Sequence, residues 1–132
     1  MNKFRGKRKD NGEWIYGKLY DISLRGKIHP CIQDGAYAYK NASRYGYKVH
    51  PESIGLFTGR QDGKGVDIYD ADIIEFDIKE WGGNDNIHIV EWNNKESEWC
   101  WGGGAASDME WRKVIGNKFD NPELVARAKE TY

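Results

Sequence analysis

The chain has 132 residues, which is long enough for one domain to bury a core without disulfides or metal ions. Its 20 Lys and Arg residues nearly balance 21 Asp and Glu residues, which argues against a protein that mainly coats nucleic acid, because such proteins are usually strongly basic. With no secretory signal, no membrane-length apolar run and only two cysteines, the composition predicts a reduced protein of the cytoplasm that has no membrane partner.

Short aromatic and β-branched runs broken by glycine are typical of β-strands joined by turns, and the chain holds six Trp, eight Tyr and 16 Gly residues. The first hairpin is predicted from Phe4–Lys7 and Glu13–Ile22, because the Asn11-Gly12 pair between them suits a tight turn. A second turn at Leu24–Lys27 leads to a third strand at Ile28–Gln33. Residues 34–46 have no clean period and are expected to form a loop or irregular hairpin.

Two short strands are predicted between Tyr47 and Gly59. The acidic stretch TGRQDGKGVDIYDADIIEFD starts at the end of the second one and runs from Thr58 to Asp77. A single straight strand through it would bury Asp70 and Asp72 among isoleucines, and buried carboxylates without partners are very costly. We therefore expect a turn at DAD that points both aspartates outward, where their oxygens accept backbone N–H bonds, followed by a core strand.

The remaining chain predicts a second hairpin, a last strand and a helix. IHIVEW (87–92) and SEWCWG (97–102) flank the turn NNKE, and MEWRKVIGN (109–117) is the last strand. Asn121 and Pro122 are typical N-cap and first-turn residues, so a helix is expected to follow them and to dock on the barrel or on a partner subunit.

Three stretches resemble the YopX family of phage and prophage proteins nearly from end to end: KFRGKRKDNGEWIYG, VHPESIGLFTGRQDGKGVDIYDADIIEFD and VIGNKFDNPEL. The differences are mild, with His50 where the family tends to have Asp, Asp70 where it has Glu and Ala71 where it has Gly. The resemblance implies a β-barrel fold in which the stretch IYDADII is part of an SH3-like barrel. It implies no activity, cofactor or catalytic residue, because the family is uncharacterised.

We therefore predict a mainly-β chain in three parts that form one compact unit. These are an antiparallel β region over residues 1–55, a small SH3-like β-barrel over residues 56–120 and a short C-terminal α-helix over residues 121–132.

Acidic residues give the first candidate site: Asp62, Asp67, Asp70, Asp72, Glu75 and Asp77. Their spacing does not match a calcium loop, and solvated turn carboxylates explain them more simply.

The histidines and cysteines give a second candidate: His29, Cys31, His50, His88 and Cys100. They lack the two close pairs of a zinc site, although cysteine–histidine catalysis depends only on proximity in space. The glycines at 102–104 are without the Lys and Ser/Thr of a phosphate loop, so a flexible loop or lid is expected there. No metal, cofactor or catalytic residue is predicted.

Aromatic residues with basic neighbours give the best functional lead. The candidate binding surface comprises Arg5, Lys7, Arg8, Trp14, Tyr16, Trp99 and Trp101. Such residues bind peptides or single strands in small barrels, while most aromatic rings of a small β domain form its core.

The leading hypothesis is a non-enzymatic binding or assembly module of phage type that acts through protein or peptide contacts, with self-association plausible at β edges. One alternative is a nucleic-acid binder that uses the basic and aromatic first hairpin. The other is an enzyme that uses the corner at Asp70 and Asp72.

Overall fold

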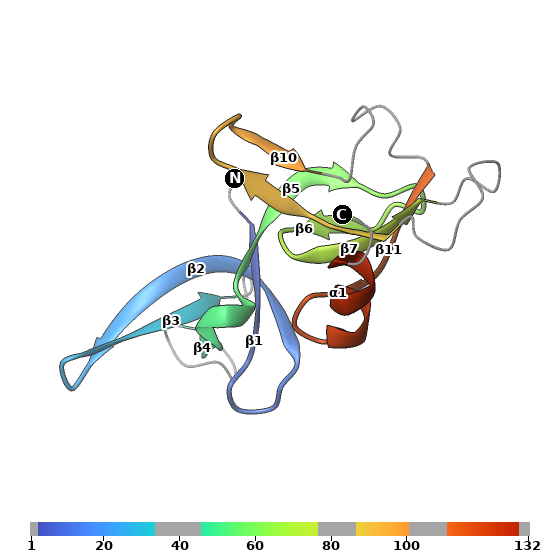
Figure 1. The fold of residues 1–132 in the computed structure, drawn as a ribbon. Coiled ribbons are helices and arrows are strands. Elements are labelled where there is room, and N and C mark those ends of the chain that lie inside the picture. The colour runs from blue at the N-terminus through green and yellow to red at the C-terminus, as the bar shows by residue number, and fades with distance from the viewer. Residues whose placement is uncertain (1–2, 34–45, 77–86, 101–110, 130–132) are drawn as a thin grey trace. The chain divides into compact units, whose positions relative to one another are not determined.

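The computed structural model describes residues 3–33, 46–76, 87–100 and 111–129 of the chain. Two compact units are present, Met1–Phe57 and Thr58–Tyr132 (Figure 1). Of the loop predicted at 34–46, all but Gly46 lies outside the described residues, and so do the glycines at 102–104.

The first unit is an antiparallel sheet in the order β4-β3-β2-β1-β5. Its strands are β1 (Phe4–Lys7), β2 (Trp14–Leu24), β3 (Lys27–Gln33), β4 (Tyr47–Lys48) and the first residues of β5 (Gly55–Gln61). The predicted first hairpin is confirmed, since β1 pairs with β2 around a turn in which Gly12 has a φ of 74°. The third strand is confirmed too, and β2 and β3 form a long hairpin (Figure 1).

One face of this sheet forms the core of the first unit. Ile15, Ile32 and Val49 are buried there, and the side chains that pack against them are Phe4, Leu19, Tyr47 and Ile54. Gly6 lies on the same face, because a Cβ at this position would stand 3.0 Å from both Ile32 Cδ1 and Val49 Cβ. Side chains alternate along a strand, so the neighbours of Gly6 in β1 point to the opposite face.

The second unit is built on a three-stranded antiparallel sheet in the order β11-β7-β8. Its elements are the remainder of β5, β6 (Asp67–Tyr69), β7 (Asp72–Phe76), β8 (Ile87–Ile89), β9 (Glu91–Asn93), β10 (Glu98–Cys100), β11 (Arg112–Asn117) and α1 (Pro122–Lys129). The hairpin predicted around NNKE is confirmed by the pairing of β9 with β10, and β6 is the neighbour of β5.

Two apolar clusters hold the second unit together, one on each face of the three-stranded sheet. Ile73, Ile87 and Ile89 pack with Ala128 of α1, and the partly buried members of this cluster are Ile115, Leu124 and Val125. The helix was expected to dock on the barrel or on a partner subunit, and it packs on the open three-stranded sheet of this unit (Figure 1). The second cluster consists of Ile68, Ile74 and Val90, with Trp99 and Val114 packed against it.

The mainly-β fold, the antiparallel first region and the short terminal helix are confirmed. The narrower prediction of an SH3-like barrel is not confirmed, because each sheet formed by the described residues is open. Within the same residues no helix is both long and apolar enough to cross a membrane.

The turn predicted at DAD is confirmed, and it is a tight corner between β6 and β7. Ala71 adopts a left-handed backbone conformation with a φ of 70°, which explains why a related chain could use glycine there. Its N–H donates to Val90 O at 2.9 Å, and its carbonyl accepts from the N–H of Lys118 at 2.8 Å. Backbone hydrogen bonds to two other segments therefore fix the corner.

Candidate binding surface

Cations and aromatic rings alternate on the face of the first sheet opposite its core. We call this surface the basic-aromatic face, and its members are Lys3, Arg5, Lys7, Trp14, Tyr16, Lys18, Tyr20 and Phe57. The register supports this assignment: Arg5 lies opposite Tyr16 and Gly55, and Lys7 lies opposite Trp14. The other members follow at intervals of two residues along the same strands, and successive odd or even residues share a face.

Each cation of this face lies over an aromatic ring. The distances from the charged group to the ring centroid are 4.8 Å for Lys3 and Phe57, 4.7 Å for Arg5 and Trp14, 5.5 Å for Lys7 and Trp14, and 5.4 Å for Lys18 and Tyr20. Such contacts stabilise a cation by the quadrupole of the ring. The contacts hold the cations in place between the rings, so that the face presents a fixed pattern of charge and aromatic surface.

Exposure distinguishes the members of the basic-aromatic face. Tyr16 is 44% exposed, whereas Arg5 is only 7% exposed. Lys18 is exposed, and Lys3 and Lys7 are half-buried. The three lysines and Tyr16 are therefore accessible to a ligand, and Arg5 contributes chiefly by holding Trp14.

Charge is divided unequally between the two units. The first unit has 11 Lys and Arg against 5 Asp and Glu, a net charge of +6, while the second has 9 against 16, a net charge of −7. These values sum to the −1 of the whole chain. The near-neutral total therefore conceals a basic unit, and the basic-aromatic face belongs to it.

Arg8 lies apart from the other basic residues of the predicted surface. It is bridged to Val49, on the core side of the sheet, and its guanidinium carbon lies 3.6 Å from the centroid of the Tyr47 ring. Its Nε and Nη2 donate to the two carboxylate oxygens of Asp10 at 2.9 and 2.6 Å, and this interaction lowers the pKa of Asp10. Arg8 is thus held by a carboxylate and a ring away from the basic-aromatic face.

The tryptophans of the later hairpin belong to the second unit. Trp99 packs on the core cluster of that unit, and its ring meets Trp92 edge to face with centroids 5.2 Å apart. Trp92 remains 45% exposed. Trp101 lies outside the described residues. Trp99 is therefore mainly a core residue, and Trp92 is the more accessible ring.

The acidic corner is organised by backbone hydrogen bonds. Asp72 Oδ2 accepts the N–H of Tyr69 at 2.8 Å, as predicted, but the prediction that Asp72 points outward is wrong, because its side chain is 1% exposed. Asp70 is half-buried. The carboxylate can lie inside because it has a hydrogen-bond donor there, which offsets part of its desolvation.

Asp62 provides a second turn in the acidic stretch. One carboxylate oxygen accepts the N–H groups of Lys64 and Val66 at 2.8 and 2.9 Å, and the other accepts the N–H of Val114 at 2.9 Å. Asp67 accepts from the side-chain amide of Gln61 at 3.0 Å. Glu75 is exposed, and Asp77 lies outside the described residues. These contacts identify Asp62 and Asp72 as residues that fix turns.

The histidines and cysteines are dispersed. Cys31 is fully buried, and this burial raises the pKa of its thiol, while Cys100 is exposed. Burial, followed by the charge of Arg112, lowers the pKa of His88. His50 Nδ1 lies 3.7 Å from Glu52 Oε1. No three metal-ligating side chains come together in the part of the chain that the structure describes.

Three members of the basic-aromatic face were missed by the sequence interpretation: Lys3, Tyr20 and Phe57. The signal for the first was present in KFRGKRK, where Lys3, Arg5 and Lys7 alternate with Phe4 and Gly6. A strict two-residue period predicts that these three cations share one face and that Arg8 does not. Phe57 could not be found in this way, because its place beside Lys3 depends on the pairing of β1 with β5.

The comparisons with known proteins agree with this architecture. A solved structure, the crystal structure of protein EF1440 from Enterococcus faecalis, is similar in fold with a TM-score of 0.55 and 20% sequence identity. The similarity covers 95% of this chain and 98% of that chain. No curated protein sequence matches. Residues 3–126 match the family of the YopX protein. The chain therefore belongs to the YopX family.

Proposed function

We propose that this chain is a non-enzymatic binding module whose basic-aromatic face binds single-stranded nucleic acid. The observation that carries the proposal is the alternation of four cations with four aromatic rings on one face of a unit with a net charge of +6. Proteins that bind single strands combine positive charge along the backbone path with rings on which bases stack.

The strands space these groups regularly. Residues two apart in a strand are about 7 Å apart, so Lys3, Arg5 and Lys7 form a row of positive charge along β1. The accessible ring of Tyr16 lies in the neighbouring strand, directly opposite Arg5. An extended strand of nucleic acid can place phosphates along the cations and a base on the ring, whereas the bases of a duplex are already stacked and paired.

The proposal treats the protein as a binding module rather than an enzyme because its acidic residues have structural roles. Three backbone N–H groups donate to Asp62, and one donates to Asp72 inside the corner. A carboxylate that fixes a turn is poorly placed to act as a general base, because protonation or movement would break the turn.

We also propose that the protein acts in the cytoplasm of a phage- or prophage-bearing bacterium. This location is supported by the resemblance to phage and prophage proteins and by the thiols of Cys31 and Cys100, neither of which is in a disulfide.

The direct test is the binding of a fluorescently labelled single-stranded oligonucleotide to the full chain, followed by anisotropy over a range of salt concentrations. The expected result is saturable binding whose affinity falls with added salt, and weaker binding to the same sequence as a duplex. Absence of binding at low salt, or equal binding to single strand and duplex, would contradict the proposal.

A second candidate function, assembly through protein contacts, is favoured by the distal end of the β2–β3 hairpin. Ile28 is 71% exposed and Leu24 is 44% exposed, and neither belongs to the core cluster of the first unit. Apolar side chains on a projecting hairpin are suited to insertion into another protein surface. Sedimentation equilibrium tests this candidate: concentration-dependent mass that Ile28→Ser abolishes supports self-assembly, and a monomer at all concentrations contradicts it.

A further inference from the structure

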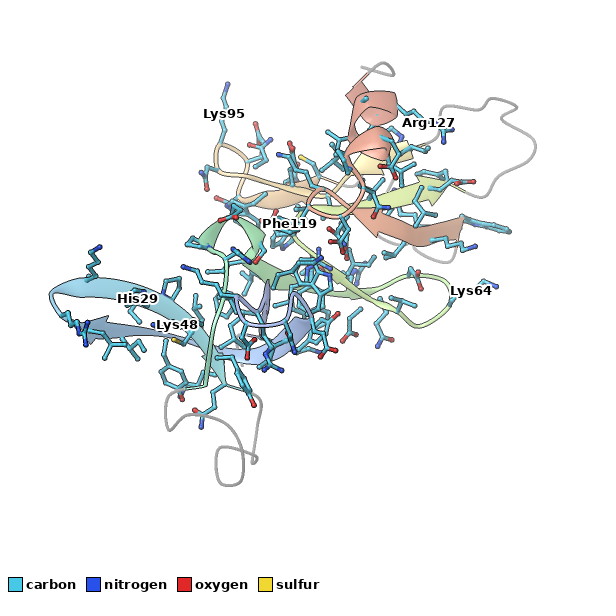
Figure 2. The ribbon with its side chains drawn as sticks, turned by 90° about the horizontal axis from the view of Figure 1, so that it is seen from below. His29, Lys48, Lys64, Lys95, Phe119 and Arg127 are labelled. Atoms are coloured by element: carbon cyan, nitrogen blue, oxygen red, sulfur yellow. The ribbon has the colours of Figure 1, made fainter. Side chains whose placement is uncertain are left out.

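A second group of positive charges surrounds His29, beyond the rings of the basic-aromatic face. Lys48 in β4 lies opposite Cys31, and Cys31 is two residues from His29 in β3, so the side chains of all three share one face. Figure 2 labels the side chains of His29 and Lys48 in this part of the first unit. The N–H of Lys9 donates to Lys48 O at 2.9 Å, which fixes the turn after β1 beside β4.

The register shows that this face continues the basic-aromatic face. Cys31 lies opposite Tyr20 in β2, and the Lys18 ammonium lies over the Tyr20 ring. A path from Lys18 over Tyr20 to Lys48 therefore crosses three neighbouring strands. A ligand that follows the face from β1 across β2 meets this second group of cations next.

Among the described residues, the charged groups that lower the pKa of His29 are all positive. Partial burial of the imidazole, and then the positive charges of Lys48, Lys9 and Lys27, hold the pKa of His29 below its usual range. From β2 the residue opposite His29 is Ile22, which carries no charge. Asp21 lies opposite Pro30, the residue next to His29 in β3. Because side chains alternate along a strand, Asp21 points to the other face of the hairpin.

We propose that His29, Lys9 and Lys48 form an anion site that accepts a phosphate group. A tetrahedral anion offers acceptor oxygens to the two ammonium groups and to both imidazole nitrogens once these carry protons. It also offsets the mutual repulsion of the lysines. This inference rests on the proposed function in one respect, because the phosphate group that we expect to bind at this site belongs to the backbone of the nucleic acid.

The site makes binding dependent on pH, with a sign that follows from the charges. Burial and the neighbouring cations disfavour the protonated form of His29. A bound anion would offset the charge of those cations and so raise the pKa of His29. By linkage, the affinity for the anion must increase as the pH falls through the titration of His29.

Proton NMR of the full chain tests the site with sulfate, a tetrahedral dianion that does not titrate near neutral pH. The His29 imidazole is titrated in sulfate and in sodium chloride of equal ionic strength. The expected result is an upward shift of the His29 titration midpoint in sulfate, with a smaller shift for His88, which lies in β8 of the second unit and serves as the internal control. Equal shifts of the two histidines, or no shift, would overturn the proposal.

Variants separate this site from the rest of the face. Lys48→Gln is expected to raise the His29 midpoint without sulfate and to remove most of the sulfate-induced shift. His29→Gln is expected to abolish the rise in oligonucleotide affinity between about pH 8 and about pH 6, which His88→Gln, a change in the second unit, retains. If the oligonucleotide does not bind at all while sulfate still shifts His29, the proposed function fails and the anion site stands. If the oligonucleotide binds but His29→Gln leaves its pH dependence unchanged, the site is overturned and the function stands.

Discussion

The guanidinium carbon of Arg5 lies 4.7 Å from the centroid of the Trp14 ring, although Arg5 is paired in register with Tyr16. The side chain therefore reaches diagonally across the two strands. Lys7 lies over the same ring at 5.5 Å, so two cations cover Trp14, while Tyr16 keeps 44% of its surface exposed. This arrangement assigns different roles to the two rings: Trp14 holds the cations in position, and Tyr16 is the ring on which a base can stack.

Replacement of Tyr16 with alanine should weaken oligonucleotide binding by about 1–3 kcal/mol, the usual loss for one stacked base. Tyr16→Phe keeps the ring and should bind nearly as tightly as the natural protein. Fluorescence anisotropy measures both, and circular dichroism checks that each variant is folded. Equal affinities for Tyr16→Ala and Tyr16→Phe would show that no base stacks on this ring.

Replacement of Asp72 with alanine should lower the free energy of unfolding by about 2 kcal/mol or more. The carboxylate is buried and accepts the Tyr69 N–H at 2.8 Å, so its loss leaves a buried donor without this acceptor. Glu75→Ala, an exposed position in the same strand, should change stability by less than about 0.5 kcal/mol. Urea unfolding gives both values, and a small effect at Asp72 would contradict its role in the corner.

Replacement of Ala71 with glycine should stabilise the protein by about 0.5–1 kcal/mol. A left-handed conformation costs an L-residue about 1–2 kcal/mol, and the greater freedom of glycine in the unfolded chain offsets only part of this gain. Ala71→Val should destabilise, since a β-branched side chain tolerates positive φ poorly. A lower urea midpoint for Ala71→Gly than for the natural protein would contradict the corner geometry.

Gly116 is required by the close approach of β11 to the start of α1. A Cβ at this position would stand 2.8 Å from Asn121 Cγ and closer still to Asn121 Oδ1, the atom that accepts the Asn117 N–H at 3.1 Å. Gly116→Ala should therefore cost about 1–3 kcal/mol of unfolding free energy. In an Asn121→Ala background the same change should cost less, and an equal cost in both backgrounds would show that the two residues do not interact.

The features that could be predicted from sequence are those set by local chemistry. Asn11 and Gly12 specify the first hairpin turn, and the DAD corner follows from the cost of a straight strand through it. The helix after Asn121 begins where predicted, but the side-chain oxygen of Asn121 accepts from Asn117, upstream of the helix. The backbone carbonyl of Asn121 accepts the first N–H groups of the helix from Leu124 and Val125.

The features that could not be predicted depend on pairing between distant segments. The contact of Arg8 with the Tyr47 ring depends on the bridge of Arg8 to Val49, and the position of Phe57 depends on the partner of β1. Asp72 was expected outside because the donor that satisfies it inside could not be foreseen. The positive charge of the first unit, in contrast, could be read from the sequence, because the predicted region 1–55 already has the net +6 that the −7 of the remaining chain nearly cancels.

The salt dependence of oligonucleotide binding tests the central claim most directly. Each phosphate contact of a single strand contributes about −0.7 to the slope of log affinity against log salt. The variant Lys3→Gln/Lys7→Gln/Lys18→Gln should therefore have a slope shallower by about 2 than the natural protein. Lys64→Gln/Lys95→Gln, which removes two lysines at turns of the second unit (Figure 2), should keep the natural slope. An unchanged slope in the triple variant, or an equal loss in the control, would contradict the assignment of the nucleic-acid contact to the basic-aromatic face.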